Sequence, residues 1–175
     1  MKDTTLQAGV LQQVAADVEA TGASFIKTIL AINPDDFNRV PFEGSWTAAQ
    51  VAEHIRLSIT GTIAIFNASV TATDRDPGEY INAVKDIFLD FDARYPSAAA
   101  ILPADKLYRK ETLKDELAAI FGELQQNIQV KALTETCLAA QIPGIGHLTR
   151  LEWAYLAVYH TQRHDHQIKN IVGMF

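Results

Sequence analysis

Residues 149–172 read TRLEWAYLAVYHTQRHDHQIKNIV. The segment opens with a capping box, because Thr149 can accept the backbone N–H of Glu152 while the Glu152 side chain reaches back. Apolar residues, together with His160 and His164, then recur every three or four positions, which is the period of one helix face. The segment therefore predicts a long helix that ends near residue 172.

Three further segments show the same helical period. Capping boxes begin at Thr4 and Thr47. The apolar stripes behind them predict helices over about 5–31 and 48–70. A similar stripe predicts a helix over about 111–132, and none of the four segments resembles a β-hairpin.

A long connection, residues 71–109, separates the second of these helices from the third. It contains a shorter predicted helix over roughly 79–94, and Pro96 and Pro103 then interrupt the chain. Such a length does not suit a tight helix hairpin but suits a crossover along the side of a bundle. The predicted fold is all-α, a four-helix bundle with a long crossover connection between helices 2 and 3, with residues 1–175 as a single domain.

Composition and charge bear on the partners and on the compartment. The net charge of the chain is -6, and its lysines and arginines are scattered singly, so that it lacks the basic stripe of a nucleic-acid-binding protein. No stretch is long and apolar enough to predict a membrane span, and the first residues lack the apolar core of a secretory signal. The single cysteine, Cys137, excludes an internal disulfide and fits a reducing compartment. We expect a cytoplasmic protein with no nucleic-acid or membrane partner.

Three histidines share the apolar faces of two predicted helices. His160 and His164 lie one turn apart on the last helix, in a row that continues into apolar positions. His54 lies within the apolar stripe of the second helix. If these two helices are neighbours, the three imidazoles meet and predict a site for one divalent transition metal. His147 and His166 are predicted to be surface residues, because the first precedes the last helix and the second faces away from His164.

A simpler interpretation stays open beside the metal site. A His-x3-His pair on a helix arises by chance, and one inward histidine is more often a core residue with a satisfied hydrogen bond. Burying three imidazoles without partners is unfavourable, however. One ion would satisfy all three.

Several neighbouring side chains are weaker candidates. Glu53 could accept a hydrogen bond beside the ligands or act as a general base, with a solvated flank position as the alternative. Gln167 could orient a ligand or a water, with plain polar packing as the alternative. Arg163 could steady a carboxylate or a nearby loop, or form a surface ion pair. Trp46 and Trp153 are predicted to be packing residues. No residue is assigned a catalytic role.

The combined pattern resembles the DinB/YfiT-like superfamily of metalloenzymes. Three stretches carry the likeness: GSWTAAQVAEHI at 44–55, PGIGHLTRLEW at 143–153 and HTQRHDHQI at 160–168. The shared features are a tryptophan followed by a helical histidine, a Gly-x-x-Thr before the last helix, and His-x-x-Arg-His-x-x-Gln-Ile within it. The order and lengths of the predicted helices match as well, so the likeness covers nearly the whole chain.

The resemblance implies a four-helix bundle with a metal triad, which falls on His54, His160 and His164. It also implies zinc or nickel as the metal, a homodimer, and an activity that differs between branches. Some relatives transfer low-molecular-weight thiols and others are metal-dependent hydrolases.

The leading hypothesis is an enzyme that acts on a small molecule with the help of a divalent metal. A thiol-dependent S-transferase is the first version and a metal-dependent hydrolase the second, because a bound metal lowers the pKa of a thiol or a water. The alternative is a non-catalytic metal-binding or ligand-binding bundle. The sequence offers no obvious fourth ligand, which favours an open, catalytic type of site.

Overall fold

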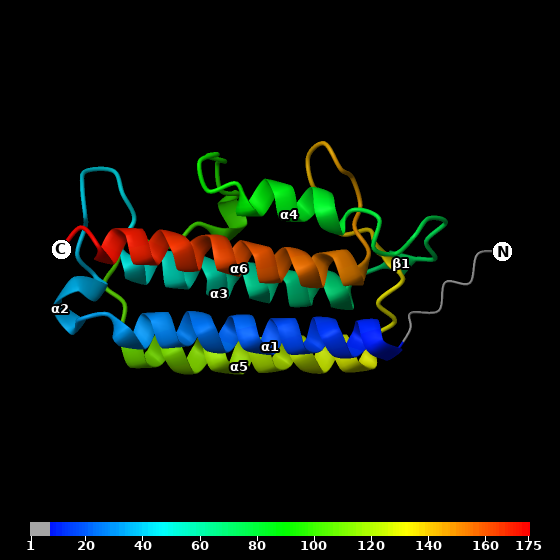
Figure 1. The fold of residues 1–175 in the computed structure, drawn as a ribbon, viewed down its shortest axis with the longest axis horizontal. Coiled ribbons are helices and arrows are strands. Elements are labelled where there is room, and N and C mark those ends of the chain that lie inside the picture. Colours follow the sequence, from blue (N-terminus) through cyan, green and yellow to red (C-terminus); the bar gives the residue numbers. More distant parts are fainter. Residues whose placement is uncertain (1–7) are drawn as a thin grey trace.

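Four long helices form the body of the protein. The structure is a computed structural model that describes residues 8–175. The long helices lie side by side as a bundle (Figure 1): α1 (Ala8–Ala31), α3 (Ala48–Asn67), α5 (Lys110–Val130) and α6 (Arg150–Val172). Helices α1 and α3 each contact both α5 and α6, so α1 and α3 lie diagonally across the bundle. The predicted four-helix bundle is confirmed; the capping box at Thr4 lies outside the described residues.

Two predicted helices are shorter than expected. Helix α3 ends at Asn67 rather than near residue 70, because the chain enters strand β1 (Val70–Thr71). Helix α4 (Ile81–Leu89) replaces the helix predicted over roughly 79–94. It ends where the Asp90 carboxylate accepts the backbone N–H groups of the next residues, which competes with continued helix.

Short elements join the helices. A single helical turn, α2 (Pro34–Phe37), follows α1, and a 3-10 turn, η1 (Ala99–Ile101), precedes α5. Strand β1 pairs antiparallel with β2 (Thr136–Cys137), so that Val70 lies opposite Cys137. The sequence did not predict this pair, because strands so short carry no periodic signal and lie far apart along the chain.

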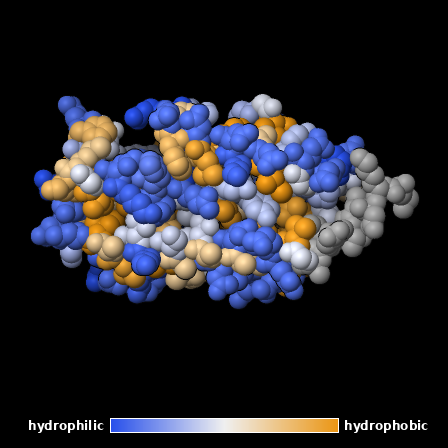
Figure 2. Space-filling model, viewed as in Figure 1, coloured by the Kyte–Doolittle hydropathy of each residue, from blue (hydrophilic) through white to orange (hydrophobic). Residues whose placement is uncertain are grey.

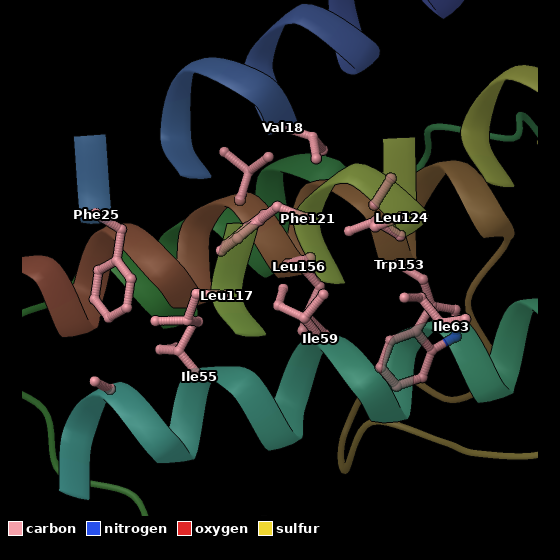
Figure 3. Packing of buried hydrophobic residues seen from close by; sticks show 14 of the residues in the cluster. Val18, Phe25, Ile55, Ile59, Ile63, Leu117, Phe121, Leu124, Trp153 and Leu156 are labelled. Atoms are coloured by element: carbon pink, nitrogen blue, oxygen red, sulfur yellow. The ribbon is translucent and has the colours of Figure 1, made fainter. Parts of the chain in front are cut away.

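The core lies between the four long helices. Figure 3 shows Ile55, Ile59 and Ile63 along one face of α3, opposite Leu117 and Leu124 of α5. These side chains are buried, and burial of each such side chain stabilises the fold by about 1.5–3 kcal/mol.

Helices α1 and α5 approach closely at one glycine. A Cβ built on Gly22 would lie 2.7 Å from Cγ of Phe121. The missing side chain therefore makes room for the aromatic ring between these helices.

The crossover is fastened to the beginning of α6. The predicted capping box is present, since Thr149 accepts the N–H of Glu152 and the Glu152 carboxylate accepts the N–H of Thr149. The fully buried Glu152 carboxylate also accepts bonds from Arg75 and from the backbone N–H of Tyr80. These bonds hold α4 on the outer side of α6 (Figure 1).

The surface is largely hydrophilic on the face shown in Figure 2, with smaller hydrophobic areas between the hydrophilic ones. No helix within residues 8–175 is long and apolar enough to cross a membrane.

Candidate metal centre

Three buried histidines meet between α3 and α6. These helices contact each other and run in opposite directions (Figure 1), so the beginning of α3 lies beside the end of α6. His54 comes from α3, and His160 and His164 come from α6. The Nε2 atom of His160 lies 3.1 Å from Nε2 of His54 and 2.9 Å from Nε2 of His164.

Burial keeps all three imidazoles neutral near pH 7. Each histidine is less than a tenth exposed. Desolvation by burial lowers the pKa of His54, lowers that of His160 well below its ordinary value, and lowers that of His164 to about 3. Neutral imidazole is the form that binds metals.

The second ring nitrogen of each histidine has its own partner. Nδ1 of His54 lies 2.8 Å from the backbone carbonyl oxygen of Ile101, in η1. Nδ1 of His164 lies 2.7 Å from Oε1 of Gln167. Since both acceptors are carbonyl oxygens, both Nδ1 atoms carry the proton and both Nε2 atoms present lone pairs.

His160 cannot satisfy both of those lone pairs. Its Nδ1 lies 2.9 Å from the hydroxyl of Ser58. If its Nε2 carries a proton, that proton can point at only one of the two facing nitrogens, so at least one buried lone pair lacks a donor. A cation at the common point would satisfy all three Nε2 atoms, and His160 would then donate its Nδ1–H to Ser58.

The distances from Nε2 of His160 to the other two Nε2 atoms also fit a metal. Ligand nitrogens about 2.0–2.1 Å from one ion lie roughly 3 Å apart in tetrahedral or octahedral geometry. Within residues 8–175, the group that could hold an ion consists of these three histidines. Imidazoles suit zinc, nickel and similar ions better than calcium or magnesium.

Gln167 and Glu53, the two candidate supporting residues, differ in their contacts. Gln167 bonds to His164, as described above. The Glu53 carboxylate is buried but accepts two hydrogen bonds from Arg56, each 2.7 Å long. Among the described residues it makes no hydrogen bond to His54. The reason is its position, about 100° around the helix.

A cleft of about 600 Å³ reaches the cluster from the surface. His164 and Trp46 line it, and the Trp46 ring lies 5.1 Å from the ring of His54. Trp46 is therefore more than the packing residue predicted from the sequence, since it forms a wall beside a candidate ligand.

The loop after α4 forms another part of the cleft wall, and Arg163 holds it. The guanidinium of Arg163 donates to the carbonyl oxygens of Phe88, Asp90 and Ala93. Of the three roles that the sequence left open for Arg163, the structure shows the steadying of a loop. Phe88 also places its ring 5.1 Å from the ring of His160.

The remaining histidines and the cysteine lie outside the cluster. His166 stacks on Phe91 at 4.2 Å. His147 is half-buried rather than a simple surface residue, and bonds to Gln141 and to the carbonyl of Ala140. Burial raises the pKa of the Cys137 thiol to about 11, which suits a structural cysteine.

Two supporting groups were missed by the sequence analysis. Ser58 had a signal, because it is a polar residue one turn after His54 on the same buried stripe. The carbonyl of Ile101 had none, since every residue type offers the same carbonyl oxygen.

The chain as a whole resembles a known protein family. The sequence profile of the DinB superfamily matches residues 17–168. No curated protein matches the chain.

Two solved structures share the fold. A protein from Exiguobacterium sibiricum described as belonging to the DinB family is 16% identical, with a TM-score of 0.58 over 97% of this chain and 93% of that chain. TT2238, described as a four-helix bundle protein, is 18% identical, with a TM-score of 0.54 over 91% of this chain and 98% of that chain. At these identities the likeness concerns the fold alone.

Proposed function

Because this chain belongs to the DinB superfamily, we propose that it is a divalent-metal-dependent enzyme in which His54, His160 and His164 are the metal ligands. The observation that carries the proposal is the convergence of three buried Nε2 atoms beside a cleft. Zinc or nickel is the proposed metal.

The residues around the cluster orient the ligands. The carbonyl of Ile101 and the side chain of Gln167 fix the tautomers of His54 and His164, and Ser58 takes the corresponding place beside His160. Such outer partners hold the imidazole rings in position for an ion.

The proposed reaction is the transfer of a small thiol to an electrophile. A divalent ion held there would lower the pKa of a thiol or a water and so supply a nucleophile near neutral pH. In the transfer, a sulfur–carbon bond forms while the bond from that carbon to its leaving group breaks, and the thiol proton passes to solvent. Trp46 and the loop held by Arg163 would enclose the substrate beside His164.

Two other functions compete with thiol transfer. A metal-dependent hydrolase would use the same ligands with water as the nucleophile. A non-catalytic metal-binding bundle would use them to hold a structural ion. The group of only three ligands within residues 8–175 favours an open, catalytic site over a closed, structural one. The family resemblance also supports a homodimer, and the single cysteine supports a cytoplasmic location, as further parts of the proposal.

The test combines metal content with thiol consumption. Protein purified without an affinity tag should hold about one zinc or nickel ion per chain. His160→Ala should lose the ion, whereas the control His166→Ala should keep it, because His166 lies outside the cluster. The loaded protein should accelerate the reaction of a small thiol with monobromobimane, and chelation should abolish this acceleration.

The alternatives give different results. Metal-dependent ester hydrolysis without thiol consumption would replace the transferase by the hydrolase. Bound metal with neither activity would favour the non-catalytic bundle. Equal metal content in both variants would overturn the three-histidine site itself.

A further inference from the structure

The cleft beside the histidine cluster is positively charged in a negatively charged protein. The whole chain carries a net charge of -6. The cleft is nevertheless lined by two arginines, Arg94 and Arg163, and by no aspartate or glutamate. The sign of the cleft is therefore opposite to that of the molecule.

Two carboxylates close to the cleft along the chain have partners elsewhere. Asp90 accepts the backbone N–H groups of Asp92 and Ala93. Asp165 pairs with Lys169 and lines a different cleft, between α1 and α6. Glu43 and Asp92, which adjoin cleft residues in the sequence, do not line the cleft either. Within residues 8–175, none of these four carboxylates forms an ion pair with Arg94 or Arg163.

The two arginines have different surroundings. Arg163 gives its hydrogen bonds to backbone carbonyls, which hold the guanidinium without cancelling its full charge. Arg94 is exposed, and within residues 8–175 its guanidinium forms no hydrogen bond or ion pair. Its planar fork of donors is therefore free to bind an anion, and it matches a carboxylate in two parallel bonds.

The rest of the cleft wall is apolar and aromatic. Five of its side chains are large, hydrophobic and exposed: Phe42, Phe91, Tyr95, Leu102 and Met174. Tyr95 lies against Arg163, with 5.7 Å between the guanidinium carbon and the ring centre. Exposed apolar side chains gathered around one concave site mark a surface that binds an apolar partner.

We propose that this cleft binds a small carboxylate with an apolar or aromatic body, with Arg94 contacting the carboxylate. The volume of about 600 Å³ is within the usual range for small-molecule sites. Because His164 lines the same cleft, the carboxylate would be a substrate of the proposed enzyme. In that respect the inference rests on the proposed function. Arg163 positions the loop wall and adds to the positive potential.

The test measures binding to chelated, metal-free protein, so that it does not depend on catalysis. The probes are 2-naphthoate and its neutral counterpart 2-naphthamide. The readout is the pair of indole N–H signals in the NMR spectrum. Trp46 lines the cleft and reports on binding there, whereas Trp153 lies in the core and serves as the internal control. We expect 2-naphthoate to shift the Trp46 signal and leave the Trp153 signal in place.

The affinities should follow the charge. We expect 2-naphthoate to bind about tenfold more tightly than 2-naphthamide, which is the usual effect of one charged hydrogen-bonded pair. Arg94→Gln should remove most of this difference. The matched control Arg109→Gln should retain it, because Arg109 is exposed and does not line the cleft. The affinity of the wild-type protein for 2-naphthoate should also fall as the salt concentration is raised. This measurement does not depend on any variant folding correctly.

Three results would overturn the proposal: equal affinity for the two probes, equal effects of the two substitutions, or no movement of the Trp46 signal at saturating 2-naphthoate. Failure of the proposed function looks different. In that case the protein would bind the carboxylate in this cleft but would show no metal-dependent reaction.

Discussion

Each imidazole of the cluster is neutral for the same reason and held by a different partner. His54 relies on a loop carbonyl, His160 on a hydroxyl, and His164 on a side-chain amide. Replacing any one of these partners removes the outer hydrogen bond of one ring. At this scale the cluster consists of three buried bases, each with its own outer partner, whose Nε2 atoms meet at His160.

That burial predicts a pH dependence of stability in metal-free protein. In the unfolded chain His160 and His164 take up protons near pH 6.5, whereas in the folded chain the pKa of His164 is lowered to about 3 and that of His160 is also lowered. The unfolded state therefore binds more protons between these pH values. The contribution of these histidines to the free energy of unfolding is fully present above pH 6.5. It is lost as the pH falls, by up to about 1.4 kcal/mol per pH unit for each histidine.

Urea unfolding at pH 7 and pH 5 in the presence of chelator measures this loss. His164→Gln should show a smaller loss than the wild type, and His166→Gln, outside the cluster, should show the same loss. Identical losses in all three proteins would contradict the buried, neutral state of His164.

At the scale of elements, the seams between helices differ in tightness. Helix α1 meets α5 where Gly22 lies under the ring of Phe121. Gly122, on the neighbouring position of α5, has no atom within 4 Å of a built Cβ. One glycine is therefore required by packing, while the other only weakens its helix.

The two glycines predict opposite effects of the same substitution. Gly22→Ala should destabilise the protein by about 1–3 kcal/mol, because the buried ring of Phe121 must move. Gly122→Ala should stabilise it by about 0.5–1 kcal/mol, through the higher helix propensity of alanine. Urea unfolding of both variants checks the pair. A Gly22→Ala protein as stable as the wild type would show that the contact between α1 and α5 yields easily.

At the scale of the whole molecule, the candidate metal centre joins segments that are far apart in the sequence. His54 lies in α3 and the other two ligands lie in α6. A ligand set of this kind is complete only when the two helices are packed together. Metal binding and folding are therefore coupled.

The coupling predicts that metal stabilises the folded protein. Zinc at a free concentration a hundredfold above its Kd should raise the free energy of unfolding by about 2.7 kcal/mol. The gain should disappear in His160→Ala, which lacks one ligand. Thermal unfolding with zinc and with chelator measures it. A wild-type protein whose Tm does not change with zinc would contradict a site shared by α3 and α6.

Much of the architecture could be predicted because several signals agreed. The capping boxes at Thr47 and Thr149 fixed where α3 and α6 begin, and the apolar stripes fixed which faces are buried. The inward direction of His54, His160 and His164 followed from those faces, and the structure brings the three rings together. Their role as metal ligands stays a prediction.

The path of the crossover could not be predicted in the same way. The end of α4 depends on the backbone N–H groups that the Asp90 carboxylate accepts, and the position of the following loop depends on Arg163. The cleft is built largely from this loop and from side chains near the end of α6, so neither its charge nor its apolar wall was visible before the elements were placed. A backbone carbonyl such as that of Ile101 leaves no mark in the sequence.

The residues that follow α6 have a practical consequence for experiments. Met174 lines the cleft, and the end of the chain lies at the opposite end of the bundle from the beginning of α1 (Figure 1). A polyhistidine purification tag fused after Phe175 would place extra imidazoles at the mouth of the cleft. Those imidazoles would compete for the same ions and obstruct entry of the carboxylate probe. Fusion before α1, or removal of the tag by a protease, avoids both artefacts.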